Sequence, residues 1–431
     1  MPEPFKVTGT CYTHMVNIAM LSYHTCPLAT LGGKDTGGMN VYVRDLTMEL
    51  GRMGIHVDVF TRSQDEHVPH ILHDLGYGNR VVHIPAGPEV PCPKAELELY
   101  LPQFVEGILK FAKEKGIHYD LIHAHYWLSG LAGIELKEKW NVPLISMFHT
   151  LGHMKNQIAQ SEDEVADQNR LDGEEAVLGG SDCIVISTPA EEGQILKLYQ
   201  NHPTCIRTIP PGVDTSRFYP IPMDEARQVI GLTDQHCMLL FVGRIEPLKG
   251  LDTLLKAIAK MTRQGIMQQC PHYLTIIGGE PDAPAEKMNS EMARIQNLAV
   301  ELGIADLVIF RGKQAQDTLP YYYSAAQIVI VPSHYESFGL VALEAMACGT
   351  PVVASQVGGL AYLVQDGVTG YFVADGDSDA LASCLTTLIQ NEDLRCKIGS
   401  QARSAAQAYE WDKVSSQIVN LYYAVLKNQS G

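Results

Sequence analysis

The chain has 431 residues, 46% of them hydrophobic, so it is longer than one ordinary domain and can bury substantial cores. Its net charge of −17, from 49 acidic and 32 basic residues, argues against non-specific binding to nucleic acid or to an anionic membrane. No apolar run has the length of a membrane span and no segment resembles a signal peptide, so we expect a cytoplasmic protein.

Neither the first fifteen residues nor the cysteines form a recognisable sequence motif. Residues 1–15 predict a loosely ordered arm. The ten cysteines are scattered and include no C-x-x-C pair, which predicts reduced and mostly buried thiols.

Apolar strands and amphipathic helices alternate along the chain. In the first half the expected strands are 16–23, 56–61, 80–84, 120–125, 144–149 and 183–187, with helices at 39–53, 99–115 and 189–199. In the second half the expected strands are 238–243, 273–277, 307–311, 328–332 and 352–355, again separated by helices. This alternation predicts parallel sheets covered by helices on both faces.

A rigid, turn-rich segment separates the two halves. It contains Pro210-Pro211-Gly212, and a new strand-and-helix pattern begins near residue 238. We therefore expect an α/β protein with two doubly wound, Rossmann-like domains, residues 1–210 and 235–410, joined by a linker at 211–234. The last helix, within residues 411–431, could pack on either domain.

A pair of glycines, Gly37 and Gly38, opens the first helix, and Gly32 and Gly33 precede them. Glycines at a strand-to-helix turn allow a ligand to approach the backbone, and a helix N-terminus favours an anion. The motif lacks the G-x-G-x-x-G spacing of a dinucleotide site. Taken alone, it is more simply a tight turn.

Histidines end two neighbouring strands of the first half: His123 and His125 on one strand, His149 on the next. His123 and His125 share a face of their strand, so they could contribute to a metal site. Packed strand histidines are commoner, and a third ligand is not apparent. We expect no metal.

Two cations flank the first strand-to-helix turn of the second half. Arg244 and Lys249 stand near a helix start, where native helices more often carry acids. Because these bases oppose the helix dipole, they indicate a pyrophosphate between them and the backbone amides. The alternative is a pair of solvent-facing cations.

Two glutamates follow the strand at 328–332. Glu336 stands in the loop before a helix, and Glu344 is expected about two turns inside it. Carboxylates beside a helix N-terminus can bind sugar or ribose hydroxyls while the amides bind phosphate, which indicates a sugar-nucleotide site. By spacing alone, Glu336 is better explained as an acid that complements the helix dipole, and Glu344 as a solvated residue of the helix.

Together these motifs resemble the family 4 retaining glycosyltransferases of the GT-B fold, in which two such domains face each other across a cleft. The similarity covers nearly the whole chain. Segments 37–40, 125–130 and 149–151 are most similar to members that glycosylate inositol phosphate. Members that form sucrose 6-phosphate typically have Gln after the paired glycines, whereas Met39-Asn40 stands here.

The resemblance implies a nucleotide-sugar donor held mainly by the second domain. Arg244 and Lys249 would neutralise its diphosphate, Glu344 would hold the ribose, Arg311 would position the base, and Glu336 would contact the sugar. The full set of implied donor-binding residues is Gly38, Arg244, Lys249, Arg311, Glu336, Phe338, Gly339, Leu340 and Glu344.

For the acceptor, the resemblance implies a phosphorylated small molecule held by the first domain. The implied residues are Gly37, Asn40, Lys94, Tyr126, Thr150 and Arg170. Lys94, Tyr126, Thr150 and Arg170, which would hold the acceptor phosphate, fall in separate loops. Their spacing does not show that they converge, so this site depends on the resemblance.

The implied catalytic residues are His149, Arg244, Lys249 and Glu336. The two cations would stabilise the departing nucleoside diphosphate, and closure of the cleft about a hinge at residues 210–212 would exclude water. The chain has no Asp-x-Asp motif at a strand end, so no metal or other cofactor is expected. Glu336 is not expected to act as a covalent nucleophile.

Several alternatives stay open. The expected acceptor is inositol-phosphate-like, with fructose 6-phosphate as the alternative. The donor is expected to carry UDP with glucose or N-acetylglucosamine. A sugar-nucleotide epimerase and a noncatalytic sugar-nucleotide sensor are the competing classes. We expect no nucleic acid or membrane partner, and a homodimer is conceivable.

Overall fold

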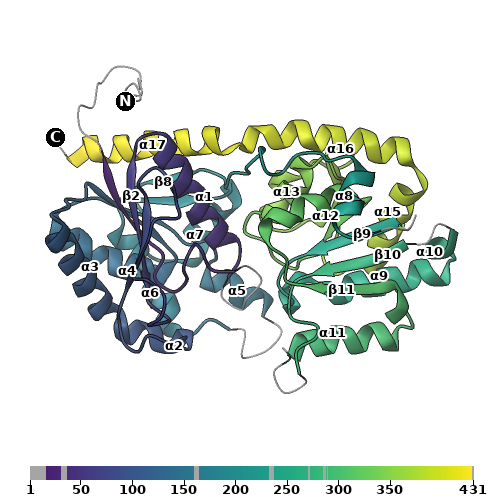
Figure 1. Cartoon of the computed structure of the whole chain (residues 1–431), viewed down its shortest axis with the longest axis horizontal. Helices are drawn as coiled ribbons and strands as arrows, with labels where there is room; N and C mark the ends of the chain where they lie inside the picture. Colours follow the sequence, from purple (N-terminus) through teal and green to yellow (C-terminus); the bar gives the residue numbers. More distant parts are fainter. Residues whose placement is uncertain are drawn as a thin grey trace.

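The computed structural model describes residues 16–30, 36–159, 165–232, 237–269, 272–284, 288 and 290–429. The expected arm at 1–15 and the glycines Gly32 and Gly33 lie outside the described residues. Two β-sheets, each covered by helices, form the two halves of the molecule (Figure 1). The expectation of two doubly wound α/β domains is confirmed.

The first sheet has the strand order β3-β4-β2-β1-β5-β6-β7-β8. Its strands are β1 (Asn17–Leu21), β2 (His56–Arg62), β3 (Ile71–Leu72), β4 (Arg80–Ile84), β5 (Leu121–His125), β6 (Leu144–Met147), β7 (Cys183–Ile186) and β8 (Ile206–Thr208). Its helices are α1 (Gly38–Arg52), α2 (Lys94–Leu97), α3 (Leu101–Lys115), α4 (Trp127–Trp140), α5 (Gly152–Ile158), α6 (Gln168–Gly180) and α7 (Pro189–Leu198). The strand order reverses between β1 and β5, where open α/β sheets bind their ligands.

The second sheet has the order β11-β10-β9-β12-β13-β14. Its strands are β9 (Cys237–Val242), β10 (His272–Ile277), β11 (Val308–Gly312), β12 (Ile328–Val331), β13 (Val352–Ser355) and β14 (Gly370–Val373). Its helices are α8 (Met223–Val229), α9 (Leu251–Arg263), α10 (Ile266–Gln269), α11 (Ser290–Glu301), α12 (Leu319–Ala325), α13 (Leu340–Ala347), α14 (Leu360–Leu363), α15 (Ser378–Gln390) and α16 (Glu392–Ala406). Here the order reverses between β9 and β12.

Every expected strand is present, with ends shifted by up to two residues. Three further strands, β3, β8 and β14, were not expected. β3 and β8 have two and three residues, and no residue of either is fully buried, so their apolar signal is weak. β3 also pairs antiparallel with β4, which departs from the expected all-parallel sheets.

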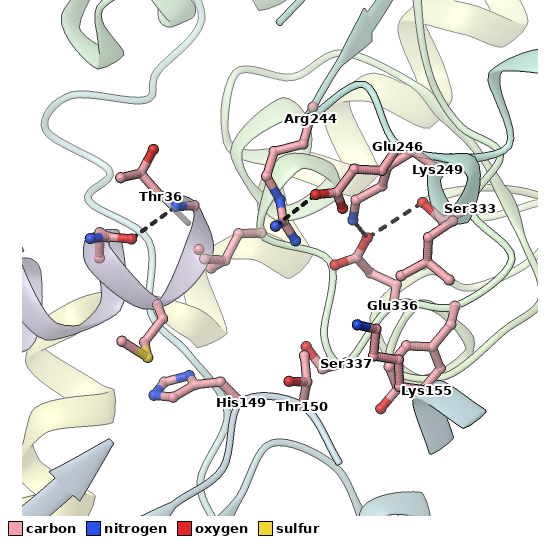
Figure 2. A pocket seen from close by; sticks show the side chains of 18 of the residues that line it. Thr36, His149, Thr150, Lys155, Arg244, Glu246, Lys249, Ser333, Glu336 and Ser337 are labelled. Atoms are coloured by element: carbon pink, nitrogen blue, oxygen red, sulfur yellow. Dashed lines mark hydrogen bonds and ion pairs between the residues drawn. The ribbon is translucent and has the colours of Figure 1, made fainter. Parts of the chain in front are cut away.

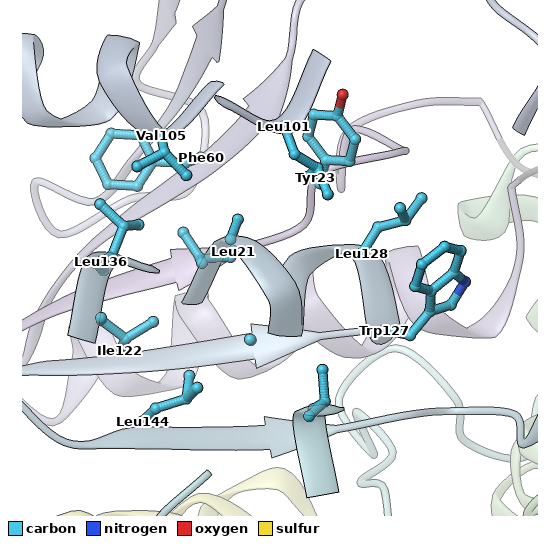
Figure 3. Packing of buried hydrophobic residues seen from close by; sticks show 14 of the residues in the cluster. Leu21, Tyr23, Phe60, Leu101, Val105, Ile122, Trp127, Leu128, Leu136 and Leu144 are labelled. Carbon is cyan, nitrogen blue, oxygen red and sulfur yellow. The ribbon is translucent and has the colours of Figure 1, made fainter. Parts of the chain in front are cut away.

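Helix α3 illustrates how the sequence pattern becomes a core. Its buried residues are Leu101, Phe104, Val105, Ile108 and Ala112, which recur at helical spacing along one face. Gly116 ends the helix at φ 63°, a conformation that favours glycine. The apolar face packs with Leu21, Phe60, Ile122 and Leu136 in the first core (Figure 3).

The chain crosses between the domains twice. Within the expected linker, α8 packs on α12 of the second domain, so this stretch is not a free connection. After α16 the chain returns, and the last helix, α17 (Trp411–Gln429), packs on α1 of the first domain (Figure 1). Of the two positions left open for this helix, the structure therefore has it on the first domain.

The expectation that the cysteines are all reduced thiols is wrong for two of them. Cys183 on β7 and Cys205 beside β8 form a disulfide, because parallel pairing of these strands places them next to each other. The other described cysteines are thiols, and only Cys348 among them is buried. None of the described helices combines the length and the apolar character that crossing a membrane requires.

Trp411 anchors α17, and we expect Trp411→Ala to destabilise the protein. The side chain is 6% exposed, contacts Tyr42 on α1 with ring centroids 5.5 Å apart, and covers Gly212 of the linker. Removal of a buried tryptophan typically costs about 3–5 kcal/mol of unfolding free energy. Urea unfolding measures the change, with Tyr362→Ala, at a half-exposed position, as control. Equal midpoints for the two variants would contradict this anchoring role.

Candidate active site

A cleft of about 1080 Å³ is lined by loops of both domains. These loops include those that follow β1, β5 and β6 in the first domain and β9, β11 and β12 in the second. Such a volume accommodates two small ligands side by side. Figure 2 shows that side chains from the two domains point toward this space.

The N-terminus of α1 forms one wall. Gly37 caps the helix, and its N–H donates to Asn40 Oδ1 over 2.9 Å. The Asn40 amide group donates to Thr25 Oγ1 and to the Cys26 carbonyl, each at 2.7 Å. Asn40 therefore holds the glycine turn in place, and its expected contact with acceptor hydroxyls stays a prediction.

The same helix end lies close to the second domain. A Cβ added to Gly37 would be 3.7 Å from Arg244 Nε, and one added to Gly38 would be 3.1 Å from Leu340 Cδ1. The helix N-terminus, with its free amides, thus faces Arg244 across the cleft. A side chain at 38 would crowd Leu340, the first residue of α13.

Both expected cations line the cleft, and each is paired with a carboxylate of the protein (Figure 2). Arg244 Nη1 lies 2.9 Å from Glu246 Oε1, and Lys249 Nζ lies 2.6 Å from Glu336 Oε2. Both cations therefore have carboxylate partners within the protein, so their place beside a helix start does not by itself require an anion, and the expected pyrophosphate stays a prediction. The ion pairs hold the cations at the cleft wall.

The loop carrying Glu336 is shaped by glycine contacts. A Cβ on Gly358 would fall 2.0 Å from the Glu336 carbonyl oxygen, and the Gly359 N–H donates to that oxygen over 2.8 Å. Gly339 starts α13 at φ 104°. Phe338, Gly339 and Leu340 all line the cleft beside Glu336.

Glu344 lies just over one turn inside α13, which begins at Leu340, rather than two turns inside as expected. It lines the cleft but is only 6% exposed and accepts a hydrogen bond from Tyr323 Oη at 2.7 Å. Burial raises the pKa of Glu344 to about 7. The carboxyl group is therefore poised to change its charge near neutral pH.

His149 lines the cleft in a strained backbone conformation, with φ at 62°. Its Nε2 lies 3.0 Å from Nδ1 of His125. Burial lowers the pKa of His149 to about 3, so the imidazole is neutral at physiological pH.

Three of the four residues expected to bind the acceptor phosphate converge. Arg170 donates to the Thr150 carbonyl and Thr150 Oγ1 at 3.0 and 3.2 Å, and its guanidinium carbon is 5.1 Å from the Tyr126 ring centroid. Arg170 also pairs with the buried Glu174 at 2.9 Å. Lys94 begins α2, next to the lining residue Pro93, and its side chain lies outside the described part.

One expected donor residue is not brought to the cleft. Arg311, on β11, is exposed and does not line the cleft. Lys313 and Gln314, just beyond the strand, line it instead. The expected contact of Arg311 with the base therefore has no support in this arrangement.

Sequence reasoning missed several residues of the site. Lys155 on α5 and Ser337 line the cleft near Thr150 (Figure 2). Outside the lining, Gln316 accepts hydrogen bonds from Arg44 on α1 and, at 2.9 Å, from Arg217 of the linker. These three residues form an interdomain clasp. Their separation along the chain left no local pattern to find.

Comparison with protein families matches nearly the whole chain. The family described as glycosyltransferase family 4 matches residues 36–217, and glycosyl transferases group 1 matches residues 222–405. D-inositol 3-phosphate glycosyltransferase of Saccharomonospora viridis is 41% identical and covers 94% of this chain and 93% of its own. The enzyme of the same name from Actinosynnema mirum is 39% identical over 95% of this chain and 97% of its own.

Solved structures show the same architecture. The sucrose-phosphate synthase of Thermosynechococcus elongatus superimposes with a TM-score of 0.87 at 35% identity, over 96% of this chain and all of that one. HepE of Anabaena, solved with UDP and glucose, gives a TM-score of 0.72 at 22% identity, over 95% of this chain and all of its own. These likenesses confirm the expected GT-B fold.

We expect Glu344→Gln to change the pH dependence of stability. The pKa of Glu344 is raised from 4.5 to about 7, so folding favours its protonated form. Its contribution is fully present below the unfolded pKa and is lost as pH rises toward 7. Relative to Glu344→Gln, the unliganded wild type should lose about 2–3 kcal/mol of unfolding free energy between pH 5 and pH 8. Urea unfolding at both pH values measures this, and parallel curves would contradict it.

Proposed function

Because this chain belongs to glycosyltransferase family 4, we propose that it moves a hexosyl group from a UDP-linked sugar to a small phosphorylated acceptor with retention of configuration. The hexosyl group is glucose or N-acetylglucosamine. The relatives named above support this class of reaction, and the contacts in the first domain support a phosphorylated acceptor.

The donor site is inferred mainly from one observation. The N-terminus of α1, with its backbone amides, faces Arg244 across the cleft, and Lys249 and Glu336 lie beside it. A diphosphate placed there would receive backbone N–H groups from one domain and cations from the other. Contacts of this kind would each lower the barrier by about 2–4 kcal/mol as the nucleoside diphosphate departs. Glu344 would hold the ribose from within α13.

The geometry also suggests how the sugar would be held. Glu336 and the amides of the loop that starts α13 lie on one side of the cleft, and His149 lies on the other (Figure 2). Hydroxyls of the transferred hexose would bind these groups. The leaving phosphate oxygen would accept the proton of the acceptor on the same face, which accounts for retention without a covalent intermediate.

The acceptor phosphate would bind between Arg170, Thr150 and Tyr126, with Lys155 nearby. We favour an inositol-phosphate-like acceptor, because Met39-Asn40 follows the paired glycines and Asn40 holds that turn. Fructose 6-phosphate is the second candidate, supported by the likeness to a sucrose-phosphate synthase.

The direct test is incubation with a panel of nucleotide sugars and phosphorylated acceptors, with products identified by mass. We expect a hexosylated inositol phosphate together with UDP. Hexosylated fructose 6-phosphate would favour the second acceptor. An epimerised nucleotide sugar, or binding without turnover, would overturn the proposal.

Lys249→Met should lower kcat by about 100-fold or more, because the leaving diphosphate would lose a preorganised cation. It should also weaken UDP binding while the fold stays intact. Lys256→Met is the matched control, since Lys256 is a half-exposed lysine on the surface of α9. Steady-state kinetics and calorimetry with UDP measure both effects. Equal behaviour of the two variants would count against a donor role for Lys249.

A double variant tests the acceptor site, because removal of Arg170 alone would leave Glu174 buried and unpaired. Arg170→Met with Glu174→Gln should raise the KM of the acceptor by about 10- to 100-fold, the value of a hydrogen bond to a charged group. The KM of the donor should change less than about twofold. Glu174→Gln alone is the control, and an equal rise in both KM values would reject the assignment.

A further inference from the structure

Behind His149 lies a cluster of ring side chains from α1, β5 and α17. We call it the histidine cluster, and its members are Tyr42, His123, His125, His149, Trp411 and Tyr422. Neighbouring ring centroids are 4.3 to 5.7 Å apart. All members except His149 are buried, and His149 also lines the cleft. The cluster thus joins the cleft to the last helix of the chain.

Two hydrogen bonds join members of the histidine cluster, one at α17 and one at the cleft. His123 Nδ1 lies 2.7 Å from Tyr422 Oη, and His125 Nδ1 lies 3.0 Å from His149 Nε2. Burial lowers the pKa of all three histidines, so each is neutral and has one N–H and one acceptor nitrogen. Burial also raises the pKa of Tyr422, which therefore keeps its hydroxyl proton.

Four other polar atoms of the cluster are buried. Within the part of the chain that the structure describes, Tyr42 Oη, His123 Nε2, His125 Nε2 and Trp411 Nε1 have no hydrogen-bond partner. Each unsatisfied group costs about 1–3 kcal/mol, and a buried water typically makes about three hydrogen bonds. A water bound among these rings would give such atoms the partners that the described side chains do not supply.

We propose that Tyr422, acting through His123, a bound water and His125, fixes the orientation of His149 and places its proton on Nδ1. The Tyr422 hydroxyl donates to His123 Nδ1, so the His123 proton resides on Nε2 and donates to the water. The water donates to His125 Nε2. The His125 proton then resides on Nδ1 and donates to His149 Nε2.

This arrangement gives His149 a defined chemical character. Its Nε2 is occupied by His125, and its Nδ1–H is the group left to donate to a ligand oxygen in the cleft. That use of the proton rests on the proposed function. Tyr422 is a positioning residue, and through it α17 contributes to the active site although no residue of α17 lines the cleft.

The proton arrangement can be measured without substrate. In protein labelled with ¹⁵N-histidine, imidazole ¹⁵N shifts at pH 7 distinguish protonated from unprotonated nitrogens, and His149→Gln identifies the His149 signals. We expect protonated Nδ1 and unprotonated Nε2 for His149 in the wild type, and loss of this pattern in Tyr422→Phe. Protonated Nε2 in the wild type, or an unchanged pattern in the variant, would overturn the proposal.

Kinetics supply the second readout. Tyr422→Phe should lower kcat by about 10- to 100-fold, as expected for a group that orients a functional histidine, with both KM values within about twofold. Tyr423→Phe, which removes a hydroxyl from the next residue of α17, should leave kcat unchanged. Equal losses of kcat in both variants would indicate a general disturbance of α17 and refute a positioning role for Tyr422. If no acceptor were ever glycosylated, the proposed function would fail while the spectroscopic test would still decide this inference.

Discussion

Parallel strands all end at one edge of their sheet, and in this protein the carboxyl edges of two sheets meet at one cleft. The loops after these strands bring His149, Arg244 and Glu336 together although they lie far apart in the chain. Each sheet reverses its strand order at the cleft, between β1 and β5 in the first and between β9 and β12 in the second. The reversal opens a crevice in each domain, and the two crevices form one site.

Charge in this cleft is balanced before any ligand arrives. Arg244, Lys249 and Arg170 are each paired with a carboxylate at less than 3 Å, from Glu246, Glu336 and Glu174 respectively. In an acidic protein, such pairs keep basic side chains oriented in a partly buried site. A phosphate entering the cleft would find cations already in position, which reduces the reorganisation needed during the reaction.

The two domains are joined by more than the linker. The return of α17 to the first domain ties the end of the chain to α1, and the clasp of Arg44, Gln316 and Arg217 links α1, η5 (Gln316–Thr318) and the linker. Gln316 also favours the ionised form of the Glu344 carboxyl group, so the clasp lies close to a residue of the cleft. Any opening of the cleft must therefore break polar contacts beside the proposed ribose site.

The sequence by itself determined the α/β class, the two-domain division into strand-and-helix repeats, and the motifs at strand ends, because apolar periodicity and turn residues act locally. It also indicated three second-domain residues that line the cleft, since Arg244, Lys249 and Glu336 lie in compact motifs. Tertiary structure decided the rest. The convergence of Arg170, Thr150 and Tyr126, the Cys183–Cys205 pair and the edge strands β3 and β8 depend on contacts between distant segments. The contact of Tyr422 with His123 joins residues 299 positions apart, and only the folded chain brings such a pair within hydrogen-bonding distance.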